Sequence, residues 1–387
     1  MHNDLDADEA WERLRASRSD PPARATTGSR RKTYSAALEQ AQQLFHAASV
    51  VGPATSPVLA FYGLSQAGRA ITAAAWSLKG EDWRLDAHGV TATGFHLPFS
   101  DIEIRTDPPA TQGSFVRVSE VLDSPVWQRD PLRLEDVWDL LPPNLSYPLT
   151  SRDRLTPLYT VGDDAGVGTH EHSLLSVPVC DLPDRVIDAG TCEALADFLV
   201  SYPAVARHES YVTTRALSLG PEAPPDYSRY QYGGGELVMN WCMPEGMGSG
   251  FDGMATSSER QAYLRTLTRG YAGVRYFLPV LGSMQRELHP LMAWWAVLYA
   301  LSMLARYQPA AWGALISVDI SQHAVPIERL LERAINHLPV LIADAITEGP
   351  RRLRDAAPQR KFSGHLASRG RGAGVSFAGR RRRAGGR

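Results

Sequence analysis

The hydrophobic pattern divides the chain into two helical stretches with a β-rich stretch between them. From Tyr34 to Ala48, apolar residues recur at the i, i+3, i+4 and i+7 spacing of a helix with one buried face. A second helix is predicted from Pro57 to Leu78, with Ser56 as its cap and Pro57 as its first residue. Because this second segment is almost entirely apolar or small, we expect it at the centre of the fold.

Short runs of β type, broken by Pro and Gly, fill the region from about His88 to Met243. These runs are FVRVSEVL, HSLLSVPV, SYVTTRAL and ELVMNWCM. Two helical segments interrupt them, near 134–141 and 192–202. Strands and helices do not alternate regularly, so the sequence favours an antiparallel or mixed sheet.

Helical patterns return after Thr256, which forms a predicted capping box with Glu259 at the start of SSERQAYLRTLTRGYAGVRYFL. The run from Pro290 to Ala305 is apolar on every side but shorter than the roughly 18 residues of a membrane span, so it predicts a buried helix. A last helix is predicted for IERLLERAINHLPVLIADAI. We therefore expect a single α+β domain in which helices from both ends pack together on a central sheet.

The two ends of the chain differ in composition from this domain, which we assign to residues 34–349. Residues 1–33 contain one short amphipathic stretch, which predicts a loosely ordered N-terminal arm. Residues 350–387 contain twelve Lys and Arg residues and one acidic residue, with almost no apolar periodicity. This composition predicts a disordered basic tail, and it makes nucleic acid a candidate partner through the tail alone.

Composition also limits the class of protein. No apolar signal segment opens the chain, so we expect a cytoplasmic protein. Cys180, Cys192 and Cys242 are too widely spaced for a disulfide framework or a zinc knuckle, which favours reduced thiols in the core. The sequence gives no indication of the oligomeric state.

Three motifs suggest enzymes or metal sites but lack the necessary context. GLSQAG at 63–68 lies inside a predicted helix and lacks the Lys-Ser/Thr of a P-loop, and the spacing of Gly63 and Ala67 indicates close helix packing instead. GSGFDG at 248–253 fits GxGxxG, but no βαβ unit follows it. The His-Glu-His triplet at 170–172 has no third ligand at a characteristic spacing. We therefore expect neither a metal nor a cofactor.

Two polar stripes on predicted buried helices are the best candidates for a binding site. They consist of Tyr62, Gln66 and Arg69 on one helix and of Tyr299, Ser302 and Arg306 on the other. Their spacings, i, i+4, i+7 and i, i+3, i+7, place each set on one helix face. A buried guanidinium is costly unless a carboxylate, carbonyl oxygens or a bound anion pairs with it. Each arginine therefore either bridges core elements or binds an anion.

Three separated segments of the chain contain short motifs. PVLAFYGLSQAGRA contains an apolar helix with a YG pair, AHGVTAT an HG motif, and WWAVLYALSMLARYQPAAW an LSM-x-x-RY run followed by Trp. Together they resemble the YaaC-like proteins of bacteria over Tyr34 to Ile346. The matching positions are Tyr62, Gly63, His88, Gly89, Ser302, Arg306 and Tyr307. The resemblance implies one domain in a bacterial cytosolic protein, and no reaction, because the family is functionally uncharacterised.

Three hypotheses of function follow, and the catalytic residues, if there are any, stay unknown. The first is a protein that binds a small anion, such as a nucleotide or phosphorylated metabolite, in a cleft lined by the two polar stripes and His88. The second is a hydrolase-like enzyme that uses His88 with Arg69 and Arg306. The third is a nucleic-acid-associated protein that acts through its tail. Two arginines that lie far apart would contradict the first hypothesis.

Overall fold

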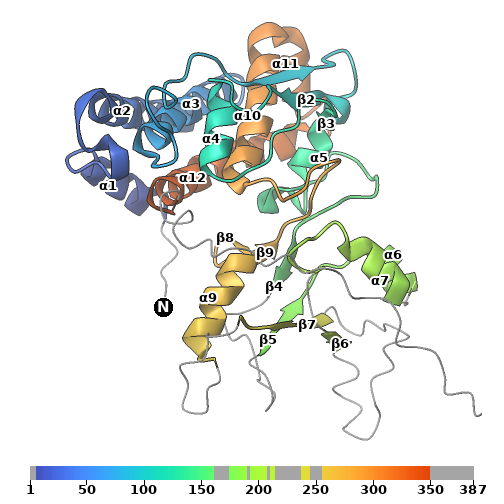
Figure 1. Cartoon of the computed structure of the whole chain (residues 1–387). Helices are drawn as coiled ribbons and strands as arrows, with labels where there is room; N and C mark the ends of the chain where they lie inside the picture. Colours follow the sequence, from blue (N-terminus) through green and yellow to red (C-terminus); the bar gives the residue numbers. More distant parts are fainter. Residues whose placement is uncertain are drawn as a thin grey trace, which may run out of the picture.

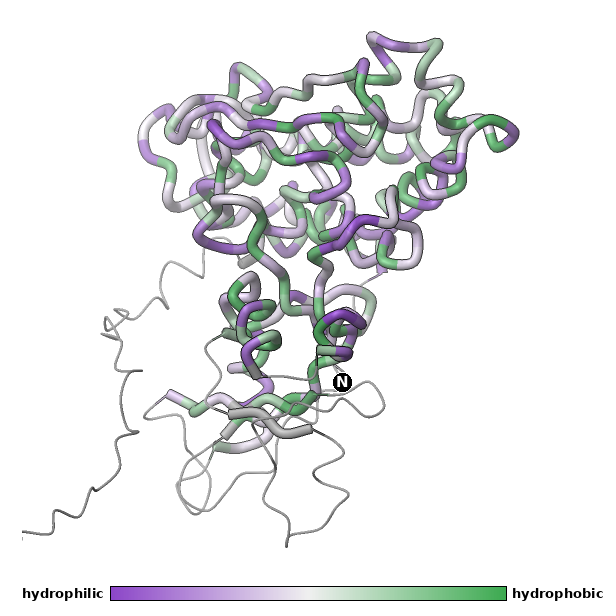
Figure 2. Tube along the Cα trace, turned by 90° about the vertical axis from the view of Figure 1, so that its right-hand side faces the viewer, coloured by the Kyte–Doolittle hydropathy of each residue, from purple (hydrophilic) through white to green (hydrophobic). Residues whose placement is uncertain are grey.

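The computed structural model describes residues 6–160, 174–189, 192–206, 210–213, 237–244 and 255–348. Within these residues the chain is an α+β protein, as predicted, and it forms two parts with separate hydrophobic cores (Figure 1). The larger part is mainly helical and is built from both ends of the described chain. The smaller part, formed by the middle of the chain, lies below it in Figure 1 and also in the side view of Figure 2.

The larger part is organised around two apolar helices, α3 and α10. Its helices are α1 (Ala7–Ser17), α2 (Gly28–Val50), α3 (Ser56–Ala74), α4 (Ser114–Val121), α5 (Leu134–Trp138), α10 (Pro290–Tyr307), α11 (Pro309–Leu315) and α12 (Ala324–Glu348), with short 3-10 turns η1 (Ala23–Thr26), η2 (Phe99–Asp101) and η3 (Pro142–Asn144). One antiparallel sheet has the order β1 (Val90–Thr93), β2 (Glu103–Thr106), β3 (Leu132–Arg133). Because α3 packs against α2, α4, α10 and α12, helices from both ends of the chain meet as predicted.

The smaller part contains two further antiparallel sheets. Their orders are β4 (Leu158–Thr160), β9 (Val274–Phe277), β8 (Arg269–Tyr271), and β5 (Leu174–Val179), β7 (Leu237–Cys242), β6 (Ser210–Thr213); the helices are α6 (Asp184–Ala189), α7 (Cys192–Leu199) and α9 (Ser257–Leu267). A bridge between Tyr159 and Cys180 joins the two sheets. The strands within the described residues thus form three small sheets instead of one central sheet, because the large helices cover one another's apolar faces.

Close packing of α3 depends on two glycines. A methyl group at Gly63 would lie 3.0 Å from Cδ2 of Phe45 in α2, so Gly63 permits the close helix packing expected from its spacing. A methyl group at Gly68 would lie 2.4 Å from Cη2 of Trp295 in α10. The helix therefore packs against α2 on one side and α10 on another through positions that have no side chain.

The end of α3 lies at Ala74, before the predicted end at Leu78. Arg30 of α2 explains the difference, because its guanidinium donates hydrogen bonds to the carbonyl oxygens of Ala73 at 3.2 Å and Leu78 at 2.8 Å. These carbonyl groups are satisfied without helical partners, so the chain can leave the helix there.

Residues 6–33, predicted to be a loosely ordered arm, are packed on the larger part. The ring of Trp11 in α1 lies 5.6 Å from that of Phe45, and the hydroxyl groups of Ser17 and Tyr34 share a hydrogen bond of 2.7 Å. The short amphipathic stretch around Trp11 therefore has enough apolar surface to dock.

The run FVRVSEVL forms α4 and not the predicted strand. Its apolar residues Phe115, Val118 and Leu122 are buried, and they also lie at i, i+3 and i+7, so the alternating pattern conceals a helical face. An ion pair of 2.8 Å between Arg117 and Glu120, three residues apart, further supports the helix.

Helix α9 begins with the predicted capping box of Thr256 and Glu259. It ends at Leu267, however, and the rest of the predicted helix forms the β8–β9 hairpin. Ala272 and Gly273, at the turn of this hairpin, have φ values of 48° and 79°. Positive φ values are incompatible with a right-handed helix, so the hairpin replaces it.

The segment 150–158 connects the two parts and is held to the larger one by ion pairs. Nη1 of Arg152 lies 2.7 Å from Oε1 of Glu135, and Nε of Arg154 lies 2.7 Å from Oδ2 of Asp139. Both carboxylate side chains are buried, with 6% and 7% exposure. Burial raises the pKa of Asp139, and the hydrogen bond from Arg154 and its charge oppose this rise.

A tilted pair of aromatic rings forms another contact between the parts. The ring of Tyr271 in β8 lies 4.2 Å from that of His337 in α12. Burial, followed by the charge of Arg333, lowers the pKa of His337 to about 4. The neutral imidazole is therefore the form that this contact accommodates near pH 7.

The packing of α3 on α10 predicts that Gly68→Ala destabilises the protein. The added methyl group collides with the rigid ring of Trp295, and such overpacking costs about 1–3 kcal/mol. The matched control is Gly313→Ala in α11, where an added Cβ has nothing within 4 Å. Urea denaturation should show a lower free energy of unfolding for Gly68→Ala alone. Equal stability of the two variants would contradict the packing argument.

The ion pair at the connecting segment predicts that Arg154→Met destabilises the protein by about 3 kcal/mol near pH 7, because it leaves the buried carboxylate of Asp139 without its partner. The loss should be smaller at acidic pH, where Asp139 can be protonated, and Arg154→Met/Asp139→Leu should recover much of it. The control is Arg185→Met, since Arg185 and Asp153 form a long, exposed pair of 3.7 Å. Thermal melts across pH would contradict the prediction if Arg154→Met matched this control at every pH.

Candidate functional site

His88 lies between α3 and β1, and the start of α4 fixes its backbone. Its carbonyl oxygen accepts hydrogen bonds from the backbone N of Phe115 at 2.9 Å and Oγ of Ser114 at 3.1 Å. Gly89 has a φ of 72°, and a methyl group there would lie 2.9 Å from Cα of Gly113. Glycine meets both demands because it has no Cβ. The HG pair therefore determines where His88 sits.

The imidazole of His88 lies among aromatic rings from both central helices. Its centroid is 5.3 Å from that of Phe61, 6.4 Å from Tyr62 and 6.1 Å from Tyr299. Tyr299 is almost fully buried, and Tyr62 and His88 are half-buried. The two polar stripes predicted from the sequence thus meet at His88.

Two guanidinium groups belong to the same neighbourhood. Cζ of Arg306 lies 5.5 Å from the ring centroid of Tyr62 and 4.8 Å from that of Tyr307, and its Nη2 donates to the Tyr307 hydroxyl at 3.0 Å. Nη1 of Arg69 donates to the carbonyl oxygen of Leu85 at 2.8 Å. Within the described part of the chain, neither arginine forms an ion pair with a carboxylate.

The pKa of His88 reflects the proximity of both arginines. Burial lowers this pKa first, and the positive charges of Arg306 and Arg69 lower it further. One cation from each helix therefore acts on the same imidazole, which stays neutral near pH 7. We call the five residues that make up this arrangement the His88 cluster: Tyr62, Arg69, His88, Tyr299 and Arg306.

Three predicted site residues are placed differently from expectation. Arg306 is exposed and not buried, because α10 leaves the core in its last turn, where Tyr307 is 61% exposed. Ser302 is fully buried, and its Oγ donates to the carbonyl oxygen of Tyr299 at 2.8 Å, so it belongs to the core. Gln66 is half-buried, and its side chain makes no hydrogen bond to another described residue.

Sequence reasoning missed two residues that contact the cluster, Phe61 and Tyr307. Tyr307 directly follows Arg306 in the LSM-x-x-RY run, so the motif itself contained the signal. Phe61 gave no signal, because an apolar residue on an apolar helix indicates only the core.

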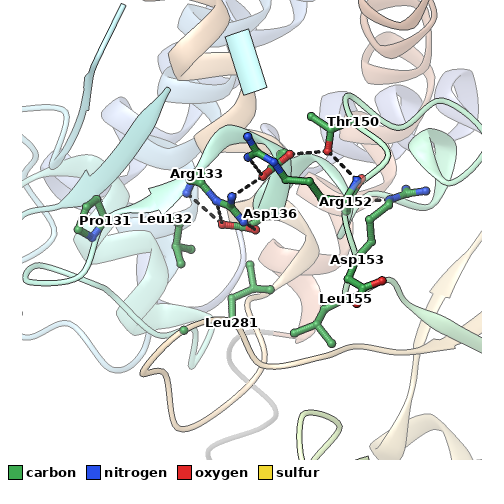
Figure 3. Close-up of a pocket in the computed structure, with 13 residues that line it drawn as sticks. Pro131, Leu132, Arg133, Asp136, Thr150, Arg152, Asp153, Leu155 and Leu281 are labelled. Atoms are coloured by element: carbon green, nitrogen blue, oxygen red, sulfur yellow. Dashed lines mark hydrogen bonds and ion pairs between the residues drawn. The ribbon is translucent and has the colours of Figure 1, made fainter. Parts of the chain in front are cut away.

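A second polar feature is a cavity of about 320 Å³ beside the segment 150–155 (Figure 3). Its lining includes three arginines, and each already has a carboxylate partner: Arg133 with Asp136, Arg152 with Glu135, and Arg154 with Asp139. An incoming anion would compete with an internal ion pair at every one of them. The arginines of the His88 cluster impose no such competition, so the cluster is the better candidate for anion binding.

Several predicted features lie outside the described residues. These are the His-Glu-His triplet at 170–172, the GxGxxG segment at 248–253 and the basic segment at 350–387. In the part of the chain that the structure describes, no three His, Cys, Asp or Glu side chains are grouped so that they could hold a metal ion. Over the same residues, no helix combines the length and the apolar character needed to cross a membrane.

Comparison with known protein families gives a match. The family model described as YaaC-like Protein matches residues 8–346, which includes α1 as well as both central helices. Neither the curated proteins nor the solved structures yield a match. The family match covers most of the 387 residues and contains the whole His88 cluster. The chain therefore belongs to the YaaC-like protein family.

Proposed function

We propose that this protein binds a small anionic ligand, a nucleotide or another phosphorylated metabolite, at the His88 cluster. The observation that carries the proposal is the pair of arginines, Arg69 and Arg306, that act on one imidazole without a carboxylate partner among the described residues. Positive charge without a carboxylate partner, at the half-buried Arg69 and beside the half-buried His88, favours a bound anion.

The donor groups of the cluster suit an oxyanion. The planar guanidinium of Arg306 has five N–H donors, and among the described residues only the hydroxyl group of Tyr307 accepts a hydrogen bond from them. Arg69 uses Nη1 for the carbonyl oxygen of Leu85, which holds the side chain in place and leaves its other N–H groups for a ligand. Arginine pairs with phosphate through two parallel hydrogen bonds, so the two side chains could hold a phosphate group from two directions.

The charge of the rest of the protein supports selective binding here. Residues 350–387 hold twelve of the 40 basic residues and one of the 42 acidic residues, so acidic residues clearly outnumber basic ones in the remaining chain. An anion is therefore repelled over much of that chain and attracted at a local group of cations. Phosphorylated metabolites occur in the cytosol, which is the compartment that we expect for this protein from its sequence.

The enzymatic alternative rests on the same His88. Its lowered pKa leaves a neutral imidazole that could accept a proton, as a general base must. A hydrolase also needs a group that orients or activates water, and no described carboxylate pairs with His88. Binding without catalysis therefore remains our proposal. The nucleic-acid alternative depends on residues 350–387 and stays a prediction from the sequence.

The proposal predicts that phosphorylated ligands raise the melting temperature of the wild-type protein and that Arg306→Met or Arg69→Met weakens this binding. Loss of one charge-assisted interaction of about 1.5–3 kcal/mol corresponds to an affinity loss of about 10- to 100-fold. Arg306→Met should fold with nearly unchanged stability, because Arg306 is exposed and has no ion pair. Calorimetric titration with the best ligand from a panel of nucleotides and sugar phosphates would measure the loss.

The matched control for this experiment is Arg329→Met. Arg329 is also exposed and stacks on a tyrosine, with its Cζ 4.5 Å from the ring of Tyr147, but it belongs to α12 and not to the His88 cluster. This variant should bind like the wild type. Two outcomes would contradict the proposal. In the first, no ligand of the panel stabilises the wild-type protein; in the second, the Arg306→Met variant binds as tightly as the control.

A further inference from the structure

We propose that His88 is the third cation of the anion site and that one proton enters the protein with each doubly charged anion. This inference rests on the proposed function, because it concerns the same cluster. His88 binds the anion as an imidazolium, and the affinity for the anion therefore depends on pH.

The geometry leaves the imidazole free to take this role. The backbone of His88 is fixed by Ser114 and Phe115, but its ring makes no hydrogen bond to a described residue. The ring is half-buried against Phe61 and Tyr299, so it is held in position by packing alone. Both ring nitrogens therefore lack a protein partner within the described residues.

The charged and titratable groups around His88 come from three directions. Helix α3 contributes Tyr62 and Arg69, and α10 contributes Tyr299 and Arg306. Asp107, just after β2, donates a hydrogen bond from its backbone N to the carbonyl oxygen of Gly89 at 3.0 Å. Burial raises the pKa of Tyr299, and the negative charge of Asp107 contributes to this rise. The charges that act on the imidazole itself are the two arginines, and both oppose its protonation.

A bound dianion reverses this balance. In the free protein, burial and two positive charges keep His88 neutral. A dianion held by Arg69 and Arg306 cancels their repulsion and gives the imidazole an acceptor, so the pKa of His88 rises on binding. By linkage, a group that gains a proton on binding makes the affinity increase as pH falls. The affinity increases as pH falls from the pKa of His88 in the bound protein to its lower pKa in the free protein. Below the pKa of the free protein, the affinity no longer changes with pH.

The charge of the site also favours one class of ligand. Two guanidinium groups and an imidazolium carry three positive charges, which a dianion neutralises better than a monoanion. A monoanion leaves more of the repulsion in place and so promotes less proton uptake. We therefore expect a preference for dianionic oxyanions, such as a terminal phosphate monoester, over carboxylates.

Inorganic sulfate is the probe for this inference, because its charge does not change between about pH 5.5 and pH 8.5, where histidine titrates. Any pH dependence of its binding therefore belongs to the protein. At constant ionic strength, the dissociation constant for sulfate should fall by up to about tenfold for each unit decrease in pH across the interval. NMR of protein labelled at histidine should show that saturating sulfate raises the pKa of His88.

Two variants make the test specific. His88→Gln should bind sulfate with a pH-independent affinity close to that of the wild type at the alkaline end. His323→Gln is the matched control, because His323 is also half-buried beside an aromatic ring, that of Phe99 at 5.2 Å, and burial also lowers its pKa. This control should keep the pH dependence of the wild type.

The outcomes separate the inference from the proposed function. Sulfate binding that is lost in Arg306→Met but independent of pH, with an unchanged His88 titration, overturns proton uptake and leaves anion binding intact. No binding of sulfate, phosphate or any phosphorylated ligand overturns both. If His88→Gln does not fold, the NMR titration of the wild type still decides, because it reports the pKa of His88 directly.

Discussion

The packing of α3 against α10 is the constraint on which the rest of the structure depends. Gly68 leaves room for the ring of Trp295, so two apolar helices from distant parts of the chain lie close together. The ring of Phe61 on α3 is consequently 5.3 Å from that of Tyr299 on α10. Tyr62 of α3 and Tyr299 of α10 then lie against the imidazole of His88. Core packing thus brings together the backbone segments that carry the His88 cluster.

Much of the fold could be predicted from the sequence, because a helix buried on all sides is apolar on all sides. This rule identified α3 and α10, and period-2 runs identified β5 and β7. The run that forms α4 was wrongly predicted as a strand. Its alternating pattern indicates a strand, but Phe115, Val118 and Leu122 also fit a helical spacing. The division of the strands into three sheets could not be predicted, since strand pairing depends on partners far apart in sequence, such as Leu174 and Cys242.

The sequence predicts which helix face carries the candidate site, but not how deeply each residue of that face is buried. Helical spacing places Tyr299, Ser302 and Arg306 on one face, yet it does not say where that face leaves the core. The structure shows a buried Ser302 and an exposed Arg306 on the same helix. His88 has no periodic signal at all, and only the HG motif singled it out. Whether an arginine has a carboxylate partner is a long-range property, which explains why the sequence left the structural and the binding interpretation of Arg306 open.

The partner of each arginine decides what it does in this protein. At the connecting segment, Arg152 and Arg154 neutralise buried carboxylates and hold this segment to the larger part. In the His88 cluster, Arg69 and Arg306 instead repel a proton from a half-buried imidazole, which is an unfavourable arrangement for the free protein. Packing of α3 on α10 maintains it, because this packing fixes the two helix backbones from which Arg69 and Arg306 extend. Positive charges that lie close together without a carboxylate partner lower the stability of the free protein, and a bound anion removes this repulsion. Functional sites are where a protein departs in this way from its most stable arrangement.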